Sequence, residues 1–138
     1  RYFSTLRDGV LSMPLRPERT LELVSASDVG RIAAVAFTVP DKLSEREIDL
    51  AADRLMMEEI AEEISRILPK NVVYTQMSGS DAAGDMSPEM RTMFRWLDEH
   101  GYTGDLLLAE NLLKRFEIQL VDLRAFLYRH KEEFRKAA

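Results

Sequence analysis

The chain has 138 residues, which predicts a single domain, and its 46% hydrophobic and 31% charged residues are ordinary for a globular protein. From this composition we do not expect disorder over the whole chain. We also expect no membrane span, because no apolar run approaches about eighteen residues, and no signal leader, because no basic-then-apolar segment opens the chain. A net charge of −5 with scattered basic residues argues against nucleic acid as a partner. The absence of cysteine excludes disulfides and thiolate chemistry, and it fits a reducing compartment, with the cytoplasm as the expected location.

The first elements are short. Residues 2–8 have the pattern of a helix end that Gly9 closes. Pro14 and Pro17 predict an extended connector over residues 13–17, because two prolines so close together exclude a helix. Leu21 and Leu23 then alternate with polar residues, which indicates a short strand.

A helix is predicted next, capped by Ser27 or Asp28 and ended by Pro40. Its apolar residues share one face and are Val29, Ile32, Ala33, Ala36 and Phe37. Gly30 lies one turn into this helix and costs about 1 kcal/mol relative to alanine. Such a glycine marks either close backbone packing or a neutral substitution, and the sequence leaves both open.

Two interpretations compete between residues 44 and 68. Ser44 and Glu47 have the spacing of a capping box, so propensity alone predicts one helix of about twenty-five residues. The apolar stripe argues against this, because it does not stay in phase. One helix face carries Met57, Ile60, Ala61, Ile64, Ile67 and Leu68. Ile48 and Leu50 instead alternate with acidic residues, as in a strand.

We therefore predict a strand near residues 47–50, a connection through Asp53, and a separate helix from about residue 56 to Leu68, where Pro69 ends it. Residues 72–75 are β-branched and aromatic, which favours another strand. A polar loop over residues 78–85 precedes a helix capped by Ser87 and ended by Gly101. Further helices are predicted from near Asp105 and from about Asp122 through Phe134. The total is three short strands and five or six helices.

No motif names a reaction. Gly79 and Gly84 have the outer spacing of a P-loop, but Asp85 and Met86 stand where that loop needs Lys and then Ser or Thr. No GxGxxG or GxxGxxG pattern occurs, so we find no nucleotide fingerprint. Tyr128 and Lys131 are three residues apart, not four as in the Tyr-x-x-x-Lys pair of short-chain dehydrogenases.

Carboxylates and histidines offer weaker candidates. Four glutamates at helical spacing resemble metal ligands or an acid–base pair, but a solvated helix face explains them better; they are Glu58, Glu59, Glu62 and Glu63. His100 and His130 lie on different predicted helices without an HExxH motif, and His130 falls on an apolar face, where a packing histidine is expected. We predict no catalytic, cofactor-binding or metal-ligating residue.

An apolar and partly aromatic cluster falls on and just after the helix that Ser87 caps. Its methionines and aromatic rings either form an adaptable pocket or pack an ordinary core. The substrate-pocket candidates are Met90, Met93, Phe94, Trp96 and Tyr102.

Several segments together are similar to one protein family. They are Gly9-Val10-Leu11, Met13-Pro14-Leu15, Ser27-Asp28-Val29-Gly30-Arg31, residues 46–51, residues 57–62, Met93-Phe94-Arg95-Trp96-Leu97 with Gly101-Tyr102, and the closing helix over residues 123–130. In this order they resemble the NmrA-like group of atypical short-chain dehydrogenase/reductases. The resemblance covers nearly the whole chain but only the second half of that family. This chain has Met56 where relatives usually cap the central helix with Thr or Ser.

The resemblance implies an α/β fold, the C-terminal part of an NAD(P)-binding Rossmann-like fold with mostly parallel strands. The nucleotide-binding N-terminal half, which holds the family's glycine-rich loop and reactive residues, is expected to be absent from residues 1–138. The chain is then one substrate-side domain of an NAD(P)-dependent oxidoreductase or NAD(P)H redox sensor, not catalytically competent alone. Its implied partners are the missing half or a second copy, and a small-molecule substrate. The alternative is a non-enzymatic interaction or regulatory module that self-associates.

Overall fold

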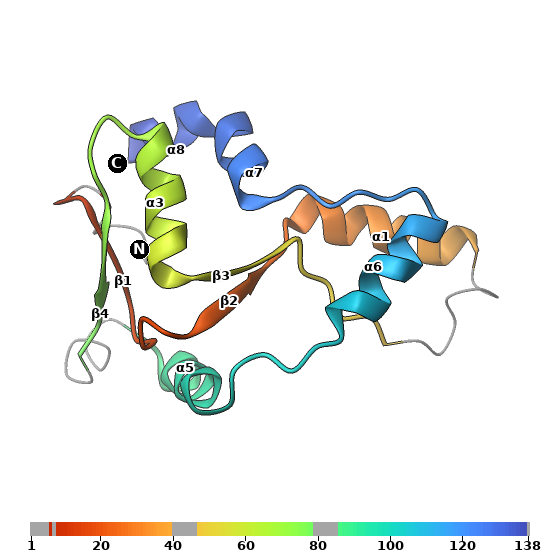
Figure 1. The fold of residues 1–138 in the computed structure, drawn as a ribbon, viewed down its shortest axis with the longest axis horizontal. Coiled ribbons are helices and arrows are strands. Elements are labelled where there is room, and N and C mark those ends of the chain that lie inside the picture. The colour runs from red at the N-terminus through yellow and green to blue at the C-terminus, as the bar shows by residue number, and fades with distance from the viewer. Residues whose placement is uncertain (1–5, 7, 40–46, 79–85, 138) are drawn as a thin grey trace.

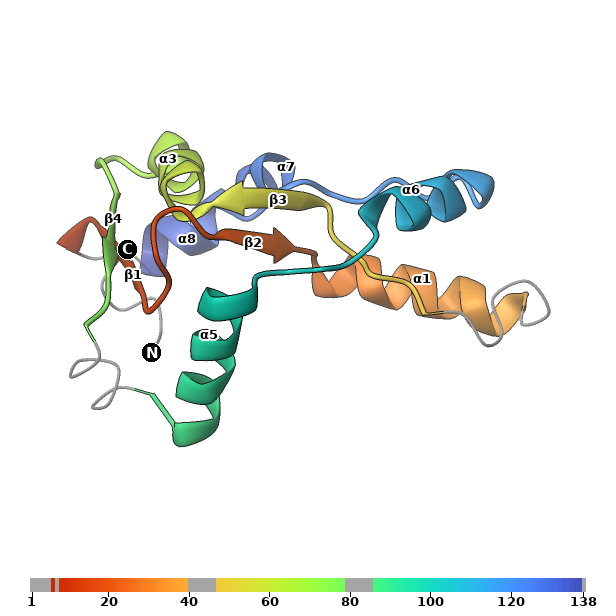
Figure 2. The ribbon, with the colours of Figure 1, turned by 60° about the horizontal axis from the view of Figure 1, so that its bottom comes forward.

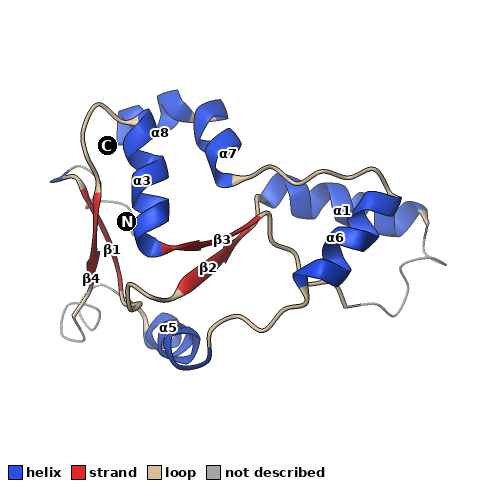
Figure 3. Ribbon diagram, viewed as in Figure 1, coloured by secondary structure: helices blue, strands red, loops and turns tan. Residues whose placement is uncertain are grey.

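The computed structural model describes residue 6 and residues 8–39, 47–78 and 86–137, which form a mixed α/β structure (Figure 1). Within these residues there are four strands, β1 Val10–Met13, β2 Thr20–Leu23, β3 Asp53–Met56 and β4 Val73–Gln76. The six helices are α1 Ala26–Thr38, α3 Met57–Ile67, α5 Pro88–His100, α6 Leu106–Arg115, α7 Leu123–Arg129 and α8 Lys131–Ala137. In chain order α1 and α3 lie among the four strands, and after β4 the described elements are all helices (Figure 3).

The strands form two separate pairs. β1 runs parallel to β4, with Val10 opposite Val73 and Met13 opposite Gln76. β2 runs antiparallel to β3, with Leu21 opposite Leu55. Among the described residues each sheet has only these two strands. The expectation of mostly parallel strands is therefore wrong, because one of the two pairs is antiparallel.

The segment before α3 shows which of the two interpretations holds. A separate strand and helix are confirmed for residues 53–67, while residues 40–46, including Ser44, lie outside the described residues. The strand expected near residues 47–50 is wrong, since residues 47–52 belong to no strand and β3 begins at Asp53. The partner strand decides this register, because Arg54 in β3 forms an ion pair with Glu22 of β2.

Two other elements differ from expectation. β1 was not predicted, because its four residues show no clear alternation of apolar and polar side chains. It is a strand because it pairs with β4, which is far away in the sequence. The closing helix is two helices rather than one, since α7 ends at a C-cap on His130 and α8 begins at Lys131. The helix expected over residues 2–8 falls mostly outside the described residues. Gly9 nevertheless has the left-handed backbone of a helix-closing glycine, with φ of 72°.

The hydrophobic core lies around α3. The apolar face predicted from the sequence is buried, with Met57 1% and Ala61 2% exposed. The buried core cluster consists of Leu6, Leu11, Leu15, Met57, Ile60, Ala61, Ile64, Ile67, Leu68, Val72, Met86, Phe94 and Leu127. Full burial of such a side chain contributes about 1.5–3 kcal/mol. Figures 1 and 2 both show α1 and α6 at the far end of the molecule from β1 and β4.

α1 contributes little to this core. The expected cap at Ser27 or Asp28 is wrong, because the N-cap is Ser25, whose hydroxyl accepts the Asp28 N–H at 3.1 Å. Of its predicted apolar face only Ile32 is buried, while Phe37 is 86% exposed. Nothing lies within 4 Å of the point where a side chain on Gly30 would begin. Close backbone packing therefore does not explain Gly30.

The start of α3 has an incomplete cap. The Met56 N–H donates to the Glu59 carboxylate at 2.7 Å, but the Met56 side chain has no oxygen to cap the first turn. We expect Met56→Thr to raise the free energy of unfolding by about 1 kcal/mol, because a hydroxyl at this position accepts an otherwise unpaired backbone N–H. Urea unfolding measures this, with Met56→Ala as the control that lacks the hydroxyl. A Thr variant no more stable than the Ala variant would contradict it.

Candidate functional site

Three charged side chains hold the extended segment between α6 and α7 in place. Asp28 in the first turn of α1 accepts the Val121 N–H at 2.9 Å. Arg31, one turn further, forms an ion pair with Asp28 and donates to the Gln119 carbonyl at 2.8 Å. Asp53, at the start of β3, accepts the Leu123 N–H. The backbone of residues 119–123 is therefore bound to both α1 and β3.

Asp28 is fully buried, with 0% exposure. Burial by itself raises the pKa of its carboxyl group, but the hydrogen bond from Val121 and the bonds from Arg31 and Ser25 outweigh burial. The pKa of Asp28 is therefore held below its ordinary value, and the side chain is ionised at neutral pH. A buried and fully bonded carboxylate of this kind orders the segment that it holds.

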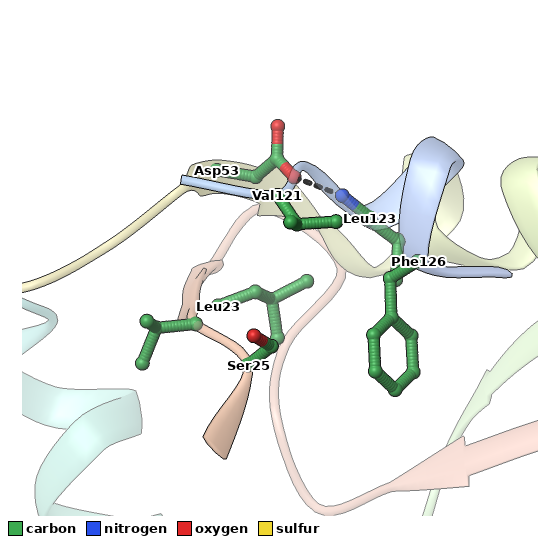
Figure 4. A pocket seen from close by; sticks show the side chains of 7 residues that line it. Leu23, Ser25, Asp53, Val121, Leu123 and Phe126 are labelled. Atoms are coloured by element: carbon green, nitrogen blue, oxygen red, sulfur yellow. Dashed lines mark hydrogen bonds between the residues drawn. The ribbon is translucent and has the colours of Figure 1, made fainter. Parts of the chain in front are cut away.

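A small cavity of about 150 Å³ opens beside this segment, at the end of β2 (Figure 4). Its lining residues are Leu23, Val24, Ser25, Asp53, Val121, Leu123 and Phe126. Figure 4 shows Leu23 and Ser25 on one side of it, Val121 and Leu123 on the opposite side, and the Phe126 ring at the flank. The walls are almost entirely apolar, so the cavity suits an uncharged ligand.

A larger hollow of about 630 Å³ lies along α6. Its walls come from one face of α6, from two alanines just before β3, and from the start of the same extended segment. The lining residues are Ala51, Ala52, Leu106, Ala109, Glu110, Leu113, Lys114, Glu117, Ile118, Gln119 and Leu120. Glu110 and Lys114 form an exposed ion pair at 2.8 Å. Its volume falls in the range of about 300–1,000 Å³ typical of small-molecule sites.

The structure places four of the five predicted pocket residues on different sides of α5 and the fifth, Tyr102, just after this helix. Phe94 is buried in the core and Met90 packs against it. Met93 and Trp96 are 43% and 51% exposed and line an open depression on the outer face of α5. Tyr102 follows Gly101 directly after the helix. The pKa of its hydroxyl is raised, mainly by burial and to a smaller extent by the negative charge of Glu22. That these residues contact a substrate stays a prediction.

The other candidates have structural roles. The His130 ring contacts the tilted ring of Phe126 at a centroid distance of 4.6 Å and bonds to Glu133 at 3.0 Å, while His100 stacks on Trp96 at 5.0 Å. Glu63 is not solvated as predicted, because Arg124 of α7 binds its carboxylate through two bonds of 2.6 and 3.0 Å. Among the described residues, no three His, Cys, Asp or Glu side chains are grouped to hold a metal ion.

The turns from strand to helix bear on nucleotide binding. Two such turns occur in the described residues, from β2 to α1 and from β3 to α3, and neither contains glycine. The first turn of α1 holds the buried Asp28, and that of α3 holds Glu58 and Glu59. Carboxylates at these helix ends repel a phosphate group. The P-loop alternative at Gly79 and Gly84 lies outside the described residues.

The sequence interpretation missed the hollows beside residues 117–123. Their walls come from segments far apart in the chain, which no local pattern brings together. Asp28 and Arg31 did carry a signal, since an acidic residue three positions before an arginine forms a pair on one helix face. Nothing in the sequence indicated that Asp28 would be buried.

Fold and site together define a mixed α/β protein with ligand-sized hollows and no helix among the described residues long and apolar enough to cross a membrane. The model of the NmrA-like family matches residues 3–134, so the chain belongs to the NmrA-like family, whose members bind NAD(P). The resemblance seen in the sequence is thereby confirmed at the level of the family. No curated protein matches the chain.

Proposed function

We propose that this chain is the substrate-side, C-terminal part of an NmrA-like NAD(P)-dependent oxidoreductase or NAD(P)H redox sensor. The parallel pairing of β1 with β4 carries this proposal. Parallel strands occur almost only in larger sheets with both faces covered, and within the described residues this pair has no third strand. The family's nucleotide-binding half would supply the remaining strands.

The N-terminal ends of α1 and α3 also support a dinucleotide site that is separate from this substrate-side part. A Rossmann fold binds the pyrophosphate at a helix N-terminus reached by a glycine-rich turn. Ser25 and Met56 precede α1 and α3, the two helices that follow a strand through described residues alone, and carboxylates lie in the first turns of both helices. These carboxylates support a dinucleotide site outside the described residues, and the volume of the hollow along α6 supports a substrate site there.

We expect the chain alone to bind NADPH with a Kd weaker than about 1 mM, because the strand-to-helix turns among the described residues offer no backbone site for the pyrophosphate. Isothermal titration calorimetry with NADPH measures this directly. The chain combined with the nucleotide-binding half of a family member is the positive control. Micromolar binding by the isolated chain would show that the dinucleotide site lies within residues 1–138 and would contradict the proposal.

The second candidate is a non-enzymatic interaction module, and the outer face of α5 favours it. Trp96 and Met93 are residue types enriched at protein interfaces, and here both are half exposed beside an open depression. Unpaired strand edges also promote self-association, and they do so under either function.

For the interaction module we expect light scattering to show a mass that rises with protein concentration and an association at least about tenfold weaker in Trp96→Ala, since buried interface tryptophans often contribute 2 kcal/mol or more. Phe37→Ala, which removes a still more exposed aromatic ring from α1, is the matched control. A monomer at all concentrations, or equal association of the two variants, would contradict this function. NADPH binding is not involved, so the result is independent of the oxidoreductase proposal.

A further inference from the structure

The α6 wall of the large hollow has an apolar stripe and a charged stripe. The apolar stripe has the three- and four-residue spacing of one helix face and consists of Leu106, Ala109 and Leu113, of which the last two are buried. The charged stripe lies beside it and is formed by Glu110 and Lys114, both exposed, with Glu117 just after the helix. A ligand in the hollow therefore meets apolar surface inside and charged side chains at the rim.

The charges at the rim do not cancel. Lys114 is paired with Glu110 at 2.8 Å. Arg31, which binds the backbone next to the hollow, is paired with Asp28. Within the part of the chain that the structure describes, Glu117 forms no ion pair. The lining therefore has one negative charge that no described cation compensates, and this charge favours a cationic ligand.

Glu117 occupies a backbone position at which glycine is expected. The end of α6 is a Schellman motif, in which the Ile118 N–H donates to the Leu113 carbonyl at 3.0 Å and the Glu117 N–H donates to the Lys114 carbonyl at 3.2 Å. Glu117 has φ of 54°, a left-handed conformation that glycine adopts without steric cost. Strained backbone of this kind is concentrated at functional sites. It supports a role for this carboxylate at the hollow.

We propose that the hollow along α6 binds an organic cation that has an apolar ring system and one ammonium group. The ring packs against the apolar stripe, and the ammonium group pairs with the carboxylate of Glu117 at the rim. An anion of the same shape would meet the uncompensated negative charge. This inference rests on the proposed function, which assigns a substrate to this hollow, and it adds the chemical class of that substrate.

Three probes with the same indole ring test the class of ligand. Tryptamine carries an ammonium group, tryptophol a neutral hydroxyl and indole-3-propionate a carboxylate. Each is titrated into the chain at neutral pH and low salt, and NMR follows the amide and methyl shifts of Ala52, Leu113 and Ile118. We expect saturable shifts with tryptamine and a Kd on the order of 1 mM for a ligand of this size.

Tryptamine should bind about three- to fivefold more tightly than tryptophol, which is the range for a partly exposed ion pair. Indole-3-propionate should bind most weakly of the three. Absence of saturable shifts with tryptamine would overturn the site. Binding of tryptophol or indole-3-propionate as tight as that of tryptamine would overturn the cationic class.

Glu117→Gln tests the group that selects the cation. We expect the preference for tryptamine over tryptophol to disappear in this variant, while tryptophol binding is unchanged. Glu58→Gln is the matched control, because it removes one negative charge from an exposed position in the first turn of α3, outside the lining. It should keep the preference of the parent. A preference that persists in Glu117→Gln would overturn the role of this carboxylate.

A second substitution tests the position of the ring. Ala52→Phe narrows the hollow and should weaken tryptamine binding by at least about tenfold, equivalent to about 1.4 kcal/mol. If that variant does not fold, Ala51→Phe gives the same test. Ala125→Phe, at an exposed position of α7 outside the lining, is the matched control and should bind as the parent does. Undiminished tryptamine binding by the variant that narrows the hollow would overturn the site.

These titrations contain no NADPH, so their result is separate from the test of the proposed function. Failure of tryptamine to bind would overturn only the cationic substrate class and would leave the dinucleotide assignment as it stands. Micromolar NADPH binding by the isolated chain would contradict the proposed function, and the tryptamine titration would still report on the hollow.

Discussion

Replacement of Asp28 by alanine is expected to lower the free energy of unfolding by about 3 kcal/mol, because the hydrogen-bond partners of this buried carboxylate are left without an acceptor. The Val121 N–H loses its acceptor, and Arg31 loses the carboxylate that holds it toward Gln119. Urea unfolding at neutral pH measures the change. A variant within 1 kcal/mol of the parent would show that residues 119–123 are held without this carboxylate.

Asp28→Asn is the matched control, since it keeps the shape and one acceptor oxygen but removes the charge. We expect it to lose about half as much stability as the alanine variant, because a neutral hydrogen bond is weaker than a charge-assisted one by roughly a factor of two.

The same pair gives a pH dependence of known sign. The pKa of Asp28 is lower in the folded chain than in the unfolded chain, where it is about 3.9. The contribution of its charge is therefore complete above about pH 3.9 and is lost as the pH falls through the folded-state pKa. The stability difference between the parent and Asp28→Asn should shrink in acid. A difference that grows in acid would contradict the lowered pKa.

Gly9→Ala is expected to lower the free energy of unfolding by roughly 3 kcal/mol, from a left-handed backbone that disfavours a Cβ and from steric overlap. Gly9 has φ of 72°, and an added Cβ would lie 2.8 Å from the Asn71 carbonyl oxygen. The same glycine accepts the Val73 N–H at 3.0 Å, at the entry to the β1–β4 pair. Its displacement therefore weakens the parallel pairing.

Gly30→Ala is the matched control, because Gly30 lies within a helix with open space around it. We expect that variant to be more stable than the parent by up to about 1 kcal/mol. Stability changes of opposite sign in Gly9→Ala and Gly30→Ala would distinguish the effect of backbone geometry at Gly9 from the general helix propensity of alanine. Urea unfolding of both variants decides this, and an unchanged Gly9→Ala protein would contradict the expected steric overlap.

Local sequence signals predicted an element correctly where its own residues determine its type and its ends. Ser87, Pro88 and Gly101 bound α5 as predicted, and the phase of the apolar stripe identified α3. These signals failed where pairing with another strand determines which residues form the strand. Residues 47–50 alternate as well as any strand, yet β3 begins at Asp53, where pairing with β2 brings Arg54 to Glu22.

The candidate site was less predictable than the fold for a physical reason. The cavity needs Leu23, Asp53, Val121 and Phe126 to meet, and these residues are spread over about a hundred positions of the chain. Composition and periodicity indicate which residues prefer burial, but they do not indicate which of these residues line the same cavity. The apolar cluster on α5 was visible in the sequence, but the helix divides it between the core and the outer surface.

The junction between β3 and α3 has no intervening loop, since Met56 ends the strand and Met57 begins the helix. An α-helix turns by about 100° per residue. One inserted amino acid at this junction would therefore rotate the buried stripe of α3 by more than a quarter of a revolution and bring glutamates toward the interior. We therefore expect relatives to have no insertions or deletions at this junction and to differ in length elsewhere.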